Sequence, residues 1–197
     1  ELTARQHILK LIYPLAMLKG KLFFKQALVL NNNKNILPAI SFYTLQATLN
    51  NNSILNFEAL KNKKVLIVNT ASNCGYTAQY KELEKLQQLY KNNLIILAFP
   101  ANNFKEQEKE NDAAIATFCK INYAISFALM QKSDVVKTET QNKVFNWLSN
   151  ANKNGWCNQP PVWNFCKYLI NEQGTLTHYF NTVISPLNKQ VKAAIMQ

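Results

Sequence analysis

The pattern of hydrophobic and polar positions changes along the first half of the chain: a continuous apolar run is followed by apolar residues at helical spacing and then by a second apolar run. This pattern predicts a strand, a helix and a second strand. The apolar run 65–68 is too short for a helix and indicates a buried strand, as does the apolar run 94–99. A helix is predicted over 77–90, where apolar residues recur at three- and four-residue spacing. Those residues are Tyr80, Leu83, Leu86, Leu89 and Tyr90. Such a unit places its two strands parallel with a right-handed crossover.

Turn signals on both sides of this unit predict two β-hairpins. Asn50-Asn51-Asn52 separates 41–49 from 54–57, and Glu172-Gln173-Gly174 separates 165–171 from 175–180. Further predicted elements are a helix over 112–122, a short strand over 127–130, a helix over 141–149, a loop over 150–162 and a closing helix over 185–196. Asp112 is the predicted cap of the first of these helices, and Ser185 caps the last one, with Pro186 at its first position. The order predicts a thioredoxin-like α/β fold, a central mixed sheet flanked by helices, with an extra N-terminal β-hairpin.

The first 38 residues differ in character from the rest of the chain. Residues 5–24 are apolar and interrupted by lysines, and the uninterrupted apolar stretch 11–18 is too short to span a bilayer. We therefore divide the chain into an amphipathic, basic extension with a linker (1–38) and a globular domain (39–197). For residues 5–24 three interpretations stay open: contact with a membrane surface, packing against the domain, or disorder, with a processed signal segment as a further origin.

The chain is strongly basic, with a formal net charge of +11 over 197 residues. Nearly all of this charge is lysine and it is dispersed, which argues against nucleic-acid binding. An anionic membrane surface or an acidic protein partner fits the charge at least as well, and a solvated lysine-rich surface is the plainest explanation.

Thiol chemistry is the way in which the cysteines can matter. The chain has four of them, widely spaced and without a CxxC pair, which is typical of neither a disulfide scaffold nor a zinc site. They are Cys74, Cys119, Cys157 and Cys166.

Cys74 lies where the first buried strand gives way to the helix. Unpaired N–H groups and the helix dipole converge at such a position, so they can stabilise a thiolate. A buried structural cysteine is the alternative, and the polar loop before Cys74 and the adjacent Gly75 argue against burial. We expect a reactive nucleophile.

Hydrogen-bond donors for such a thiolate occur in two later loops. Gln107 follows the second parallel strand, so it should lie at the same end of the sheet as Cys74. Trp163 and Asn164 precede a predicted strand and offer an indole and an amide donor. An ordinary loop glutamine and a core tryptophan are the competing interpretations.

Several blocks of the chain resemble, in order, the signature segments of the glutathione peroxidase family. They are SFYTLQATLNNNSILNFEALKNKKVLIVN, NTASNCGYTAQYKELEKL, AFPANNFKEQE, FCKINYAISFALM and VWNFCKYLINEQG. The resemblance spans about residues 40–197 without large gaps, which makes it more specific than any single motif. It implies a thioredoxin fold with an added hairpin and a peroxidase activity.

The resemblance also implies residue roles. Cys74 matches the peroxidatic residue, and with Gln107, Trp163 and Asn164 it would form the catalytic tetrad; Cys119 matches the resolving cysteine of the cysteine-type members. Such a peroxidase would reduce hydrogen peroxide and organic hydroperoxides, including lipid ones if the N-terminal segment touches membranes. Thioredoxin would recycle it, with glutathione as the alternative reducing co-substrate, and no metal or organic cofactor is implied.

Further expectations concern the setting and the rival functions. The long loop that builds the tetrameric members of the family is missing between Met130 and Trp163, so the resemblance implies a monomer. We expect a cytoplasmic protein, with membrane association through 5–24 as the alternative. Rival functions are a one-cysteine glutathione-dependent peroxidase, a thiol–disulfide oxidoreductase (which would want CxxC), and a non-enzymatic redox sensor.

The chain departs from the family pattern at a few positions. Where members usually read FPCNQFG it has Ala101, Asn103 and Lys105-Glu106, which puts in doubt the shape of the loop before Gln107. Ala124 and Ala128 replace a usual glycine and proline. Cys157, in a predicted loop, is a competing resolving thiol, whereas Cys166 is expected to pack in a strand.

Overall fold

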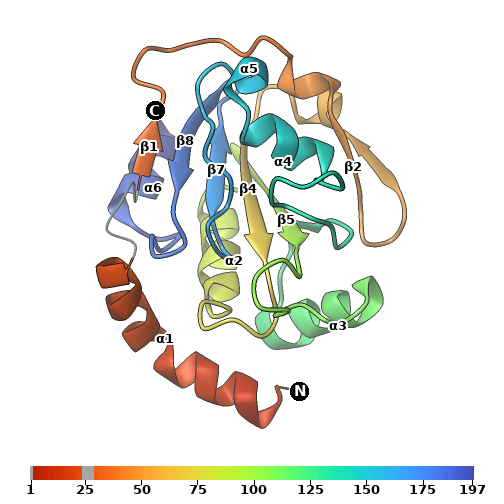
Figure 1. The fold of residues 1–197 in the computed structure, drawn as a ribbon, viewed down its shortest axis with the longest axis vertical. Coiled ribbons are helices and arrows are strands. Elements are labelled where there is room, and N and C mark those ends of the chain that lie inside the picture. The colour runs from red at the N-terminus through yellow and green to blue at the C-terminus, as the bar shows by residue number, and fades with distance from the viewer. Residues whose placement is uncertain (1, 24–28) are drawn as a thin grey trace.

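A mixed β-sheet forms the centre of the molecule (Figure 1). The computed structural model describes residues 2–23 and 29–197, and within these the sheet has six strands in the order β1-β8-β7-β4-β5-β6. The strands are β1 (Val29–Asn31), β4 (Lys64–Thr70), β5 (Leu94–Pro100), β6 (Ala128–Leu129), β7 (Lys167–Ile170) and β8 (Leu176–Phe180). Strand β5 is parallel to β4 and β6, whereas β7 is antiparallel to β4 and β8, and β1 is antiparallel to β8.

Helices cover both faces of this sheet. They are α1 (Ala4–Phe23), α2 (Gln79–Leu89), α3 (Asp112–Tyr123), α4 (Lys143–Leu148), α5 (Ala151–Asn154) and α6 (Lys189–Met196). A separate hairpin pairs β2 (Gln46–Thr48) with β3 (Ile54–Asn56), between the short 3-10 helices Phe42–Thr44 and Phe57–Leu60.

The sheet separates two hydrophobic clusters. Along β4, Leu66 and Val68 belong to the cluster under α2, α3 and α6, whereas Val65 and Ile67 belong to the cluster under α4 and the hairpin. All four are fully buried. A strand covered on both faces is expected to be apolar throughout, which explains the run that predicts it.

The predicted strand–helix–strand unit, both hairpins and the thioredoxin-like fold are confirmed. Three local expectations are wrong. The cap of α3 is Asn111, whose side chain accepts from the Ala114 N–H; the cap of α6 is Asn188, because residues 185–188 form a separate turn first. The predicted loop 150–162 contains the short helix α5.

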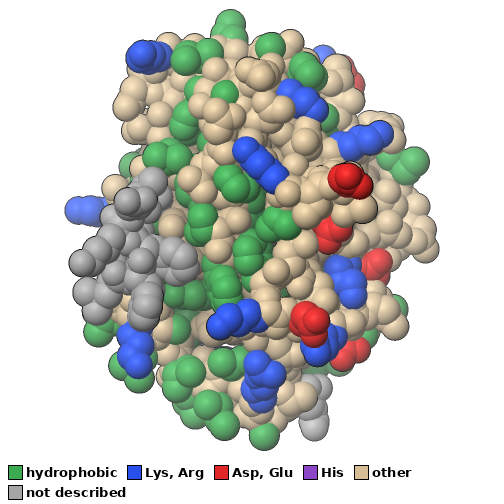
Figure 2. Space-filling view, in the orientation of Figure 1, with side chains coloured by type: hydrophobic (Ala, Val, Ile, Leu, Met, Phe, Trp, Pro, Cys, Tyr) green, Lys and Arg blue, Asp and Glu red, His purple; other side chains and the backbone are tan. Residues whose placement is uncertain are grey.

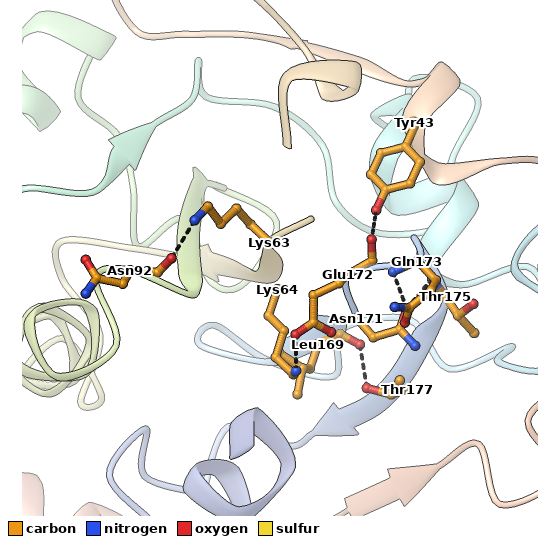
Figure 3. Close-up of polar contacts among 10 residues, drawn as sticks. All are labelled: Tyr43, Lys63, Lys64, Asn92, Leu169, Asn171, Glu172, Gln173, Thr175 and Thr177. Carbon is orange, nitrogen blue, oxygen red and sulfur yellow. Dashed lines mark hydrogen bonds and ion pairs between the residues drawn. The ribbon is translucent and has the colours of Figure 1, made fainter. Parts of the chain in front are cut away.

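The turn between β7 and β8 is tied to the first 3-10 helix (Figure 3). The Tyr43 hydroxyl donates to the Glu172 carbonyl (2.6 Å), and the Glu172 carboxylate pairs with Lys64 at the start of β4. Gly174 takes a φ of +79°, and a Cβ there would lie 2.7 Å from the Tyr43 ring. The turn therefore requires glycine on both conformational and steric grounds.

Helix α1 lies along one end of the molecule, beside the start of α2 (Figure 1). It continues through Pro14, and the described part of the chain holds no helix both long and apolar enough to cross a membrane. Residues 24–28 of the predicted N-terminal segment lie outside the described residues. Strand β1 pairs with the edge of the sheet although its residues fall within the extension 1–38 that the sequence sets apart from the domain.

Candidate active site

Cys74 lies in the loop that joins β4 to α2, residues 71–78, which we call the Cys74 loop. The Thr77 hydroxyl accepts from the Cys74 N–H (3.0 Å) and donates to the Ala71 carbonyl (2.9 Å). The Tyr76 N–H points at the Cys74 Sγ at 3.5 Å. These bonds fold the loop around the sulfur and hold it in one position.

Of the three predicted donors, Trp163 and Asn164 lie within hydrogen-bonding reach of the Cys74 sulfur, whereas Gln107 joins the site through Asn164 and the Cys74 loop. The Asn164 Nδ2 donates to Gln107 Oε1 (2.9 Å), and the Gln107 carbonyl accepts from the Asn73 N–H (3.0 Å). Hydrogen bonds from the side chains of Trp163 and Asn164 lower the pKa of Cys74. The sequence therefore identifies a group of residues that the fold does assemble, although it draws them from three separate loops.

Asn69, which sequence reasoning missed, holds the Trp163–Asn164 segment in place. Its Nδ2 donates to the Trp163 carbonyl (3.0 Å), and its Oδ1 accepts from the Cys166 N–H (3.0 Å). Its carbonyl accepts from the N–H of Phe165 (2.6 Å), whose φ is +66°. The signal was a polar side chain at the end of an apolar strand, because a buried amide requires partners.

Cys74 is fully buried, so the expectation of an exposed thiol is wrong. Burial raises the pKa of Cys74 to about 11, and the Tyr76 N–H, Trp163 and Asn164 lower it only in part. Helix α2 begins at Gln79, too far along the chain for its dipole to act on Cys74. In addition, α1 covers the loop: Ala16 Cβ would lie 3.6 Å from a Cβ at Gly75.

Cys119 is buried in α3, in the same hydrophobic cluster as Cys74. Burial raises the pKa of the Cys119 thiol to about 12; the Tyr80 hydroxyl lowers it and Glu108 raises it. Cys157 and Cys166 belong to the cluster on the opposite face of the sheet. Cys157 is only 1% exposed, so the expectation of an exposed loop thiol is wrong. The Asn154 amide holds its backbone: Asn154 Nδ2 donates to the Cys157 carbonyl (2.7 Å), and Asn154 Oδ1 accepts from the Cys157 N–H (2.7 Å).

In the loop before Gln107, Lys105 stands at the position of the glycine usual in the family. Lys105 and Glu106 both adopt positive φ, +53° and +50°. Asn103 anchors the loop by accepting from the Val135 N–H (2.9 Å) and donating to Asp134 (2.9 Å). The Lys105 ammonium lies 5.8 Å from the centre of the Trp163 ring, a cation–π distance.

Ala124 ends α3 in the left-handed region, with a φ of +49°. Glycine at this position is free of the Cβ penalty, so we expect Ala124→Gly to raise the free energy of unfolding by about 1 kcal/mol. The matched control, Ala116→Gly inside the same helix, should lower it by about 1 kcal/mol. Urea unfolding of both variants checks this; a loss of stability in Ala124→Gly would contradict it.

Glu108 is a buried carboxyl that the sequence did not single out. Its Oε2 accepts from the N–H and the hydroxyl of Ser72 (2.8 Å each), whereas its Oε1 has no partner among the described residues. Burial raises the pKa of Glu108 to about 7; bonds from Ser72 and the charge of Lys132 lower it, and Glu110 raises it. Between about pH 4.5 and pH 7 the Glu108 carboxyl is therefore protonated in the folded protein and ionised in the unfolded chain.

This carboxyl makes stability fall as pH rises. Because its pKa is raised on folding, its contribution is present at pH 4.5 and below and is lost as pH rises through about 7. We expect wild type to lose about 2.5 kcal/mol relative to Glu108→Gln between pH 5 and pH 8. Urea unfolding of both proteins at each pH checks this. The exposed control, Glu139→Gln, should show no such loss relative to wild type. If the stability difference between wild type and Glu108→Gln were the same at pH 5 and pH 8, the prediction would be wrong.

A buried cysteine that is hydrogen-bonded by an indole and an amide, on a thioredoxin-like fold, is the arrangement of the class of thiol-dependent redox enzymes. The sequence model of the family described as glutathione peroxidase matches residues 42–149. The chain belongs to the glutathione peroxidase family, and it is a peroxidase.

Relatives from distant organisms resemble it over most of their length. It is 37% identical to glutathione peroxidase-like peroxiredoxin 2 of Saccharomyces cerevisiae over 159 residues, 79% of this chain and 97% of the relative. It is 40% identical to the glutathione peroxidase homolog BsaA of Staphylococcus epidermidis over 156 residues, 79% and 96% of the two chains.

Solved structures share this fold. The chain resembles Trgpx in its apo form with a TM-score of 0.61 and 29% identity, covering 81% of this chain and 97% of that one. It also shares the fold of a thiol:disulfide interchange protein from Chlorobium tepidum, with a TM-score of 0.57 and 13% identity, covering 83% of this chain and 99% of that one.

Proposed function

We propose that this peroxidase runs a two-cysteine cycle recycled by thioredoxin. Cys74 attacks the O–O bond of a hydroperoxide and becomes a sulfenic acid, while the departing oxygen takes the thiol proton and leaves as water or an alcohol. The Cys119 thiol then attacks the Cys74 sulfur, which forms the disulfide and releases water. A thioredoxin dithiol reduces that disulfide by exchange and becomes a disulfide itself.

One observation carries the choice of Cys119 as the resolving residue. Cys119 shares the hydrophobic cluster of Cys74, whereas the other two cysteines lie across the sheet. A disulfide requires Cα atoms within about 7 Å, and Cys119 sits within a regular helix, so we infer that α3 and the Cys74 loop rearrange locally when the two sulfurs join. A thiol on the opposite face would instead have to cross the sheet.

The tetrad supplies the electrostatic stabilisation that the first step requires. Charge develops on the sulfur and on the departing oxygen, and fixed donors in a dry site stabilise such charge strongly. Trp163 and Asn164 act on the sulfur, while Gln107 is bonded to Asn164 and orients its amide. The thiol proton can leave with the departing oxygen, so a buried Cys74 does not need to be a thiolate beforehand.

The substrates are hydrogen peroxide and organic hydroperoxides, lipid hydroperoxides among them. We infer a monomer, because the chain lacks, between Met130 and Trp163, the long loop by which the tetrameric members of the family assemble. Recycling by thioredoxin requires a reducing compartment, such as the cytoplasm.

The test is peroxide-dependent NADPH oxidation, coupled either through thioredoxin and its reductase or through glutathione and its reductase. We expect sustained turnover with thioredoxin in wild type and none in Cys74→Ser. Turnover with glutathione alone would replace the proposal with a one-cysteine cycle. A single turnover that stops with both donors would favour the redox sensor.

A further inference from the structure

Helix α1 uses one of its faces to hold the Cys74 loop. The Gln6 Nε2 donates to the Ser72 carbonyl (3.4 Å), and the Ala16 carbonyl accepts from the Tyr76 hydroxyl (3.0 Å). Tyr13 stacks edge-on against Tyr76, with ring centres 6.5 Å apart. The contacted residues all belong to the Cys74 loop, so α1 is part of the surroundings of the site.

The opposite face of α1 is apolar and has no cover among the described residues. Five large side chains on it are 40% to 81% exposed, and we call them the outer stripe. They are Ile8, Leu11, Ile12, Leu15 and Leu18. At about 100° per residue they fall within a sector of about 120°, opposite the side chains that face the body. Figure 2 shows hydrophobic side chains along the lower edge of the molecule, over α1.

The charges around the outer stripe have one sign. Arg5, Lys10 and Lys19 are exposed on α1, and the sequence of Ala4–Phe23 contains no Asp or Glu. At about 100° per residue, Arg5 falls just outside the sector of the stripe, Lys19 falls within it beside Leu18, and Lys10 lies on the flank of the helix. A hydrophobic stripe accompanied by cations, on a helix that is not apolar all round, is the pattern of a helix lying in a lipid interface. A second copy of this chain fits less well, because two such helices face to face would oppose like charges, in a protein with a net charge of +11.

We propose that the outer stripe of α1 docks the protein on an anionic lipid surface while the inner face of the helix stays packed on the Cys74 loop. The stripe enters the boundary between headgroups and acyl chains, and the cations contact lipid phosphates. The loop then lies about one helix diameter, roughly 10 Å, from the lipid. That this placement serves peroxide reduction at a membrane rests on the proposed function; the docking itself does not.

The test is flotation with vesicles of phosphatidylcholine alone or with added phosphatidylglycerol, on the full chain. We expect wild type to float with the anionic vesicles, weakly with the neutral ones, and less as salt rises. Leu11→Ser/Leu15→Ser should lower the vesicle-bound fraction about tenfold or more. The matched control, Leu37→Ser/Leu89→Ser, changes two leucines of similar exposure elsewhere and should float like wild type.

Activity on a water-soluble hydroperoxide separates this proposal from the proposed function. It should be equal in wild type and in Leu11→Ser/Leu15→Ser, because neither side chain touches the Cys74 loop. Equal flotation of wild type and this variant would overturn the docking proposal even if peroxidase activity is normal. The docking proposal would also be overturned if wild type formed a dimer that does not bind vesicles and Leu11→Ser/Leu15→Ser were a monomer. If Leu11→Ser/Leu15→Ser lost flotation while wild type and all variants lacked peroxidase activity, the docking proposal would stand and the proposed function would be wrong.

Discussion

Cys119→Ser is expected to lower thioredoxin-linked peroxidase turnover by at least about 100-fold, since an intramolecular thiol is replaced by reagents that must diffuse in. The first step should survive: one equivalent of hydroperoxide is still reduced, and the Cys74 sulfenic acid accumulates. Coupled NADPH oxidation measures the turnover, and trapping with dimedone measures the sulfenic acid. The two readouts separate loss of resolution from loss of the nucleophile.

Cys157→Ser is the matched control for this prediction. Cys157 is as buried as Cys119 but lies in the cluster across the sheet, so its removal disturbs packing without touching the path between the two reacting sulfurs. We expect turnover close to that of wild type. Unchanged turnover in Cys119→Ser together with a loss in Cys157→Ser would reverse the two roles and refute the cycle.

Periodicity predicts the elements that place the site, because the physics that forms them is local. The run 65–68 and the recurring apolar positions of 77–90 each fix an element from neighbouring residues alone. The first residue of a helix is not fixed in this way: Asn111 and Asp112 have the same capping chemistry and are adjacent, so sequence cannot decide between them. Strand β1 has only three residues, and its pairing with β8 is purely tertiary.

The burial of Cys74 could not be predicted from its own surroundings. The polar loop and Gly75 do indicate exposure, but the helix that lies over them comes from the start of the chain. Likewise, spacing does not reveal that Cys119 and Cys157 end on opposite faces of the sheet. The sequence identifies the chemistry of these side chains, but only the fold determines their solvent exposure. Exposure matters because burial shifts the pKa of a thiol.

Asn164→Ala should lower kcat/KM for hydrogen peroxide by about 100- to 1,000-fold, the usual cost of removing one fixed donor from a site that stabilises developing charge. Asn164 is fully buried, lowers the pKa of Cys74, and gives Gln107 its hydrogen bond. Without it, burial acts on the sulfur with less opposition, so the pKa of Cys74 should rise. Alkylation by iodoacetamide as a function of pH measures that shift.

The control for Asn164→Ala is a variant that removes another buried amide which does not donate to the Cys74 sulfur. Asn154 is also fully buried, and its Nδ2 donates to the carbonyls of Trp147 (2.8 Å) and Cys157 (2.7 Å) on the opposite side of the sheet. Asn154→Ala should therefore cost comparable stability but leave both the alkylation profile and kcat/KM near those of wild type. If both variants lost activity in proportion to their stability, Asn164 would be a packing residue, and the charge on sulfur would depend on Trp163 and the Tyr76 N–H alone.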